Sequence, residues 1–274
     1  MTTTNRRRST LVLVLLAVAV LAAITVAGML LNGRAMESDF SRKNLLPCLA
    51  YPFGTDWLGR DMLARTLAGL SLSIRIGLLT AAVSACFALV MGIASATMGR
   101  WADRAVCFSI DLVMGIPHIL LVMLISIACG KGFFGVVTGV AVSHWTSLAR
   151  VIRGEVLQLR QAPYILAARK LGVRRRDIIR RHMLVHLMPQ FLTGLILLFP
   201  HAILHEASIT FLGFGLSSEQ PAIGVILSES MRYLTTGKWW LALFPGLSLV
   251  VVVLLFALLG ERVRLLLDPA SAQE

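Results

Sequence analysis

Apolar residues along this chain fall into long blocks separated by shorter polar stretches. The first block, Leu11 to Leu31, is unbroken and follows Arg6-Arg7-Arg8. It exceeds the ~7–15-residue core of a signal peptide and matches the ~20 residues that cross a bilayer, so it predicts an uncleaved first span. Further blocks predict five more spans, at about 72–98, 105–129, 133–148, 187–211 and 239–259. The pattern therefore predicts an all-α polytopic membrane protein with six transmembrane helices.

The longest interruption outside the predicted spans is residues 32–70. Thr55 or Asp56 can cap a helix there, because short polar side chains accept hydrogen bonds from the first free N–H groups. The apolar side chains of such a helix share one face: Leu58, Met62, Leu63, Leu67 and Leu70. We therefore expect a helix along the outer interface, with Trp57 at headgroup depth. This divides the chain into residues 1–71, a first span plus interfacial segment, and residues 72–274, the main transmembrane domain.

A second polar stretch, residues 161–186, is too basic to enter lipid. Its apolar residues recur at helical spacing in two short runs on either side of Gly172, a residue free to take positive φ. Asp177 lies near the start of the second run, where a carboxylate suits the helix dipole. The stretch predicts two short helices at the membrane surface. The alternative is a solvated loop whose arginines only fix the topology.

Composition supports a membrane protein. The 274 residues are 57% hydrophobic and 15% charged, against about a quarter charged residues in a soluble domain. The net charge of +12 does not indicate nucleic acid, because the aromatic residues are not interleaved with the basic ones. Most of the 26 Lys and Arg residues instead fall in alternate loops, which predicts cytoplasmic N- and C-termini.

Motifs for catalysis are absent from the sequence. It has no Walker lysine loop and no GxSxG elbow, so neither ATP hydrolysis nor serine hydrolase chemistry is expected of this chain. The four cysteines, at positions 48, 86, 107 and 129, form no CxxC pair and are expected to act as small hydrophobic residues. We expect no cofactor, and a membrane-embedded hydrolase is the weaker class of hypothesis.

Polar residues inside the predicted spans are candidates for lining a path, since ionisable groups in a membrane usually face the bundle interior. The candidates are His118, His144, His201, His205 and Glu206. His201 and His205 are four residues apart on one helix face, a spacing that can hold a divalent metal, although hydrogen bonds to a partner membrane subunit would also explain them. No metal site is firm on this basis. Asp111, in the third span, is expected to pair with Arg100 or Arg104.

The 161–186 stretch also carries a family resemblance. Leu166-Ala167-Ala168, Gly172 and His182-Met183-Leu184 resemble the "EAA" loop of permease subunits of binding-protein-dependent ABC importers. Leu166 replaces the usual glutamate and Val185 the usual proline, so the second short helix is free to continue into the next span. The resemblance implies that an ATPase-coupling set docks on a cytoplasmic ATPase: Leu166, Ala167, Ala168, Gly172 and Asp177.

Two further segments narrow the resemblance to one branch. Gly54-Thr55-Asp56 and Gly59-Arg60-Asp61 resemble the GTDxxGRD signature of the dipeptide, oligopeptide and nickel permeases, as do residues 205–216 and 221–233. The histidine before Glu206 and the aliphatic Leu166 are more similar to the nickel members. Nickel, free or chelated, is therefore the first expected substrate and di- or oligopeptides the alternative. A channel or secondary transporter is a remote alternative.

The resemblance implies a complete assembly around this chain. It implies the type I ABC importer permease fold in the cell's inner membrane, with a second permease subunit, expected as a heterodimer, enclosing the path. Two cytoplasmic ATPase subunits and an extracytoplasmic substrate-binding protein are the other implied partners, beside the lipid bilayer. ATP hydrolysis then belongs to the partners, and this chain is not expected to be an enzyme.

Overall fold

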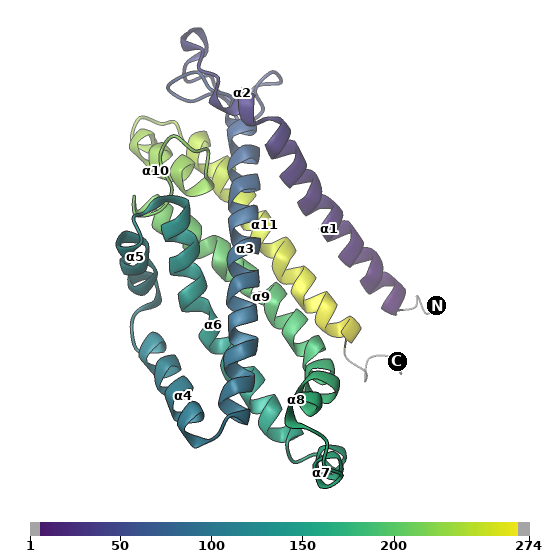
Figure 1. Ribbon diagram of the computed structural model, residues 1–274. Coiled ribbons are helices and arrows are strands. Elements are labelled where there is room, and N and C mark those ends of the chain that lie inside the picture. The colour runs from purple at the N-terminus through teal and green to yellow at the C-terminus, as the bar shows by residue number, and fades with distance from the viewer. Residues whose placement is uncertain (1–5, 268–274) are drawn as a thin grey trace.

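A computed structural model describes residues 6–267 as a bundle of helices (Figure 1). The elements are α1 (Arg6–Leu30), α2 (Asn32–Met36), η1 (Phe40–Arg42), α3 (Met62–Thr97), α4 (Arg100–Met114), α5 (His118–Ala128), α6 (Gly132–Leu159), α7 (Pro163–Lys170), α8 (Arg175–Ile178), η2 (Ile179–Met183), α9 (Leu184–Phe211), α10 (Ile223–Leu234) and α11 (Trp240–Leu267). Within these residues the only extended pairing is an isolated bridge between Thr55 and Asp61. The predicted all-α fold class is confirmed.

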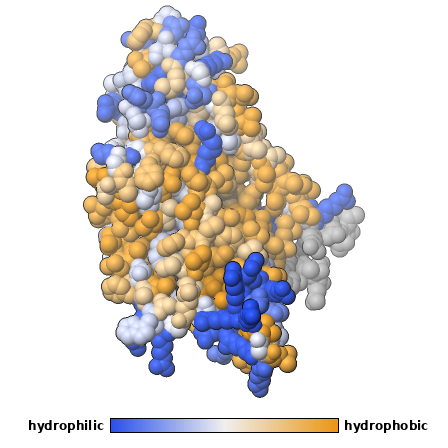
Figure 2. Space-filling model, viewed as in Figure 1, coloured by the Kyte–Doolittle hydropathy of each residue, from blue (hydrophilic) through white to orange (hydrophobic). Residues whose placement is uncertain are grey.

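The surface shows where a bilayer fits. Hydrophilic residues gather at two opposite ends, over the segment between α2 and α3 and over α7–α8, and the surface between them is mostly hydrophobic (Figure 2). Four helices are long and apolar enough to span a membrane, ending at Leu30, Thr97, Phe211 and Leu267, and the α4–α5 pair is a fifth candidate if it counts as one span. α6 has 28 residues but a polar middle, so the count of six spans stays a prediction.

The predicted interfacial helix before the second span does not form separately. Asp61, not Thr55 or Asp56, caps the helix by accepting hydrogen bonds from the N–H groups of Leu63 and Ala64, and α3 then runs unbroken for 36 residues. The proposed division at residues 71 and 72 therefore falls inside α3. Of the apolar face predicted for that helix, Met62 and Leu70 are buried and Leu63 and Leu67 are half-buried, while Arg65 and Thr66 outside that face are buried as well, so the segment is enclosed on more than one side.

The predicted third span is bent into two helices. α4 and α5 meet at 98°, with Gly115-Ile116-Pro117 at the break. Proline disfavours the helical conformation at the residue before it, so the helix stops and restarts with Pro117 as the cap of α5. The bend brings the first residue of α5, His118, toward the bundle.

The prediction that Asp111 pairs with Arg100 or Arg104 is wrong. Its carboxylate accepts a hydrogen bond from Arg150 of α6 at 3.0 Å, and not from Arg100 or Arg104 on its own helix. About two helical turns earlier, Asp103 forms a two-point pair with Arg153 of α6, at 2.6 and 2.8 Å. Both carboxylates lie on the face of α4 that meets α6, so the pairs connect neighbouring helices.

Residues 213–238, between the predicted fifth and sixth spans, contain a helix of 12 residues, α10. Its apolar positions Ile223, Val225 and Ile226 are buried, and the Ser230 hydroxyl donates to the Leu241 carbonyl of α11 at 2.8 Å. α10 covers the end of the bundle opposite α7 and α8 (Figure 1).

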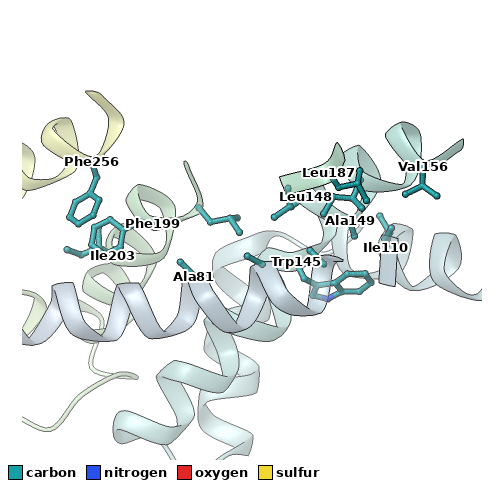
Figure 3. Close-up of a cluster of buried hydrophobic side chains, with 14 of the residues drawn as sticks. Ala81, Ile110, Trp145, Leu148, Ala149, Val156, Leu187, Phe199, Ile203 and Phe256 are labelled. Carbon is teal, nitrogen blue, oxygen red and sulfur yellow. The ribbon is translucent and has the colours of Figure 1, made fainter. Parts of the chain in front are cut away.

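The largest core cluster follows α3, α6, α9 and α11 (Figure 3). α3 presents a stripe of buried small residues, Ala81, Ala85, Ala88, Gly92 and Ala96, to its neighbours. A Cβ on Gly92 would lie only 2.9 Å from the Ala149 carbonyl oxygen of α6, so the two backbones are close. Small residues allow such approach in membrane bundles, where packing rather than water exclusion holds helices together. This frame fixes α6 and α9, which carry most of the candidate histidines.

Candidate translocation cavity and coupling segment

Three helices bring histidines from distant parts of the sequence into one cavity. His118 begins α5, His144 lies in the middle of α6, and His201 and His205 lie on α9. Together with Met114 to Pro117 and Ser143 they line a cavity of about 480 Å³. The described lining contains no carboxylate, lysine or arginine. All four histidines predicted to line a path therefore share one hollow.

His118, His144 and His205 are in mutual contact. Their ring centroids are 4.4 Å apart for His118 and His144, 4.4 Å for His118 and His205, and 4.9 Å for His144 and His205. The Nε2 atoms of His118 and His144 lie 3.5 Å apart. His144 is buried, whereas His118 and His205 are half-buried and face the cavity. The sequence paired His201 with His205, but the contact cluster takes His118 and His144 instead.

Backbone carbonyls fix the orientation of two of these rings. Nδ1 of His144 donates to the Val140 carbonyl at 2.9 Å, and Nδ1 of His205 donates to the His201 carbonyl at 2.7 Å. A carbonyl oxygen only accepts, so each Nδ1 carries the proton and each neutral ring keeps an unprotonated Nε2. Both rings therefore present a lone pair on the nitrogen that is not tied to the backbone.

Glu206, the fifth candidate for the path, does not line this cavity. It is fully buried on another face of α9, where its Oε1 accepts a hydrogen bond from the Thr210 hydroxyl at 3.1 Å. Neighbouring positions on a helix point about 100° apart, so His205 can face the cavity while Glu206 faces the helix packing. Its position indicates a role in the bundle rather than at the cavity.

Residues 161–186, the candidate ATPase-coupling segment (below, the coupling segment), lie at the opposite end from α10 and have the predicted outline. α7 ends at Lys170, Gly172 takes a φ of +76°, and a second helix starts at Arg175. That second helix does not stop: it passes through the π-helical turn η2 into α9 and forms one 37-residue helix, Arg175–Phe211. The prediction that a missing proline at position 185 would let it continue agrees with this geometry.

Buried and exposed residues divide the coupling segment into an anchor and a free face. Ile165, Ile178 and Met183 belong to the main core cluster. The side chains of Leu166 and Ala167 are exposed, Ala168 and Asp177 are half-buried, and nothing lies within 4 Å of a Cβ placed on Gly172. The segment is thus held to the bundle on one side and presents Leu166, Ala167 and Gly172 on the other.

The residues of the GTDxxGRD signature form a compact buried turn. The Asp56 carboxylate, fully buried, accepts from the N–H groups of Leu58 and Arg60, from Arg60 Nε at 2.7 Å and from Arg65 Nη1 at 2.7 Å. The Thr55 hydroxyl accepts from the Leu45 N–H and donates to the Arg42 carbonyl, and Asp61 pairs with Arg34 at 2.9 Å. Gly54 and Gly59 take φ values of +71° and +77°. Each signature residue therefore has a structural task in this turn.

Two further residues complete the network. The sequence did not single out Arg65, and it placed Trp57, at an x position of GTDxxGRD, only at headgroup depth. Arg65, with a side chain 1% exposed, also donates through Nη2 to Glu229 of α10 at 2.9 Å. Trp57 stacks on Tyr233 of α10 at a centroid separation of 4.6 Å. Glu229 and Tyr233 are one helical turn apart, so one face of α10 holds the turn. An arginine inside an apolar helix was the available signal that a buried partner existed.

Comparison with known proteins gives consistent matches. Residues 88–273 match the family described as binding-protein-dependent transport system inner membrane component. A protein of Brucella suis biovar 1 (strain 1330), provisionally named a peptide transport system permease protein, is 36% identical over 265 residues, covering 96% of this chain and 88% of that protein. The oligopeptide transport system permease protein OppC of Bacillus subtilis (strain 168) is 31% identical, over 84% of this chain and 77% of its own length.

A solved structure shares the fold. The MetNI methionine ABC transporter, in inward-facing conformations, contains a chain that superposes with a TM-score of 0.60 over 76% of this chain and 98% of its own length. The sequence identity is 17%, so this match concerns the fold alone. It confirms the predicted permease fold of ABC importers.

Proposed function

Since the chain belongs to the family of inner membrane components of binding-protein-dependent transport systems, we propose that it is the permease subunit of an ATP-driven importer of small peptides. The observation that carries the peptide substrate is the agreement among its relatives, which are named for peptide, dipeptide or oligopeptide transport. Nickel, the substrate first expected from the sequence, has no support among them. A metal cargo is favoured only by the histidine cluster in the cavity.

The mechanism requires that a movement of ATPase subunits outside the bilayer be transmitted to the helices that line the cavity. In the proposal, two ATPase subunits dock on the exposed Leu166, Ala167 and Gly172 of this chain and on the matching segment of a second permease. Movement of α7 and α8 passes into α9, because Arg175–Phe211 is a single helix, and α9 forms one wall of the cavity. A binding protein delivers substrate at the α10 end. The chain itself then makes and breaks no covalent bond.

The experiment is peptide-stimulated ATP turnover by the assembled importer in lipid nanodiscs, with binding protein added. Gly172→Val should abolish most of the stimulation, because a β-branched residue resists a φ of +76° and redirects α7 relative to α8. Gly213→Val is the matched control, with a φ of +83° and equally open surroundings after the far end of α9. Stimulation by Ni²⁺ but not by di- or oligopeptides would refute the peptide substrate. Full stimulation in Gly172→Val would refute the coupling assignment.

A further inference from the structure

His118, His144 and His205 have the chemistry of a metal-binding set that the peptide function does not use. Each residue offers one imidazole nitrogen, and the three ligand atoms all lie within 4.8 Å of one another. Among the described residues no other group of three histidine, cysteine or acidic side chains meets this condition. Imidazole is a ligand that nickel, copper, zinc and iron accept well, while magnesium and calcium require oxygen.

The spacing of the nitrogens agrees with a shared ion. Two imidazole nitrogens on a tetrahedral ion with bonds of about 2.0–2.1 Å are separated by about 3.3 Å. The Nε2 atoms of His118 and His144 are 3.5 Å apart, so this pair needs almost no rearrangement. Closing the third ligand from at most 4.8 Å requires a shift of somewhat over ~1 Å. His118 and His205 are half-buried and border open cavity, so their rings have room for that shift.

The hydrogen bonds behind the rings are those of a prepared ligand set. Metal-binding histidines characteristically donate their other ring N–H to a carbonyl or carboxylate, which fixes the tautomer and aims the free nitrogen. His144 and His205 do this through Val140 and His201, at 2.9 and 2.7 Å. Bonds from Nδ1 to backbone also form in ordinary helices. Here, however, two such bonds leave both free Nε2 atoms in a cluster with a third imidazole.

We propose that His118, His144 and His205 form a three-imidazole site for a divalent transition-metal ion inside the cavity. Three protein ligands leave a fourth position open toward the hollow, the arrangement of sites that exchange a ligand rather than of closed structural sites. No carboxylate lines the described cavity to neutralise the ion, so the site suits a metal that is held briefly or arrives with its own chelating ligand. Its place along a transport path rests on the proposed function, whereas metal binding itself does not.

The test measures metal bound to the assembled importer, purified through a histidine-free affinity tag and kept in nanodiscs. Equilibrium dialysis against Ni²⁺ should give one ion per copy of this chain, and Co²⁺ should give the intense visible absorption of a tetrahedral site. His205→Ala and His144→Ala should each weaken binding by at least about 10–100-fold, the loss that even outer-shell substitutions cause. His186→Ala, exposed near the coupling segment, should bind like the wild type.

Two variants keep the test independent of folding. His205 is only half-buried, so His205→Ala can remain assembled even if His144→Ala does not. No bound ion in the wild type, or undiminished binding in an assembled His205→Ala importer, would overturn the metal site. Peptide-stimulated ATP turnover on the same nanodiscs decides the proposed function separately, since loss of metal binding leaves that measurement available.

Discussion

The buried turn formed by the signature residues should be a main source of stability at the α10 end. Asp56→Ala removes a fully buried carboxylate that accepts hydrogen bonds from two backbone N–H groups and from two arginines. Arg65 remains, 1% exposed, with its positive charge balanced only by Glu229 at 2.9 Å. Removing one partner of a buried ion pair costs about 3–5 kcal/mol, because the other charge stays buried without compensation.

Because Glu229 is retained, the expected loss in the free energy of unfolding lies at the lower end of that range. Glu229 is 22% exposed on its side chain and also lies 3.5 Å from Arg60, so it can balance part of both guanidinium charges. A loss of about 3 kcal/mol corresponds to a fall in Tm of roughly 6–12 °C for a chain of this size. Asp56→Asn, which keeps the shape and one acceptor oxygen but removes the charge, should give a smaller fall.

The assay measures thermal unfolding of the purified importer in one detergent. Unfolding is monitored as the fraction of protein that stays monodisperse after heating. Asp39→Ala is the matched control, because Asp39 lies in the same segment and pairs with Arg42 at 2.9 Å, but on the surface. Exposed pairs contribute little, so Asp39→Ala should melt close to the wild type. If Asp56→Ala melted no earlier than Asp39→Ala, burial of this network would not be what holds the turn.

Two other predictions concern the membrane topology of the chain and the close packing at Gly59. Cys48, exposed beside the signature turn, should react with a membrane-impermeant thiol reagent added outside intact cells. A cysteine introduced by Arg175→Cys should not react. Labelling of the second cysteine but not of the first would contradict the predicted topology. Gly59→Ala should prevent folding of the turn, since its Cβ would overlap the Asp39 carbonyl oxygen, while Gly237→Ala, with a similar φ of +79° but open surroundings, should cost far less. The yield of monodisperse protein is measured for both glycine variants. Equal yields would count against the predicted overlap between a Cβ at position 59 and the Asp39 carbonyl oxygen.

Local signals in the sequence were enough for the coupling segment. Gly172 between two amphipathic runs predicted two helices that meet near the glycine, and both are present, although the second continues into α9. Turn chemistry and helical spacing act over a few residues, so local sequence was enough to predict them. The start of α3 was misplaced for a related reason. Thr55, Asp56 and Asp61 are all good capping residues, and only the tertiary network, which takes Asp56 for Arg60 and Arg65, leaves Asp61 as the cap.

Contacts between distant residues were beyond the sequence. His118 and His144 are separated by 26 residues, and they meet only because the chain bends by 98° before α5. Pro117 predicted a break in the helix but not the angle of the break, since a proline in a membrane helix can also produce a mild kink. The error with Asp111 has the same origin. Helical spacing suggests partners on one helix, whereas the actual partner, Arg150, depends on how α4 packs on α6.

The coupling segment and the cavity share one continuous helix, and this fact links the two proposals. From Arg175 to His205 a helix rises about 45 Å, enough to carry a displacement at α8 to the cavity wall. His144 stands on α6, which is held to α4 by the Asp103–Arg153 and Asp111–Arg150 pairs. If ATP-driven movement of α8 shifts α9 against α6, the distance between His205 and His144 changes. A metal ion held by three imidazoles would then lose one ligand as the helix moves, so the stroke that opens the path would also release the ion.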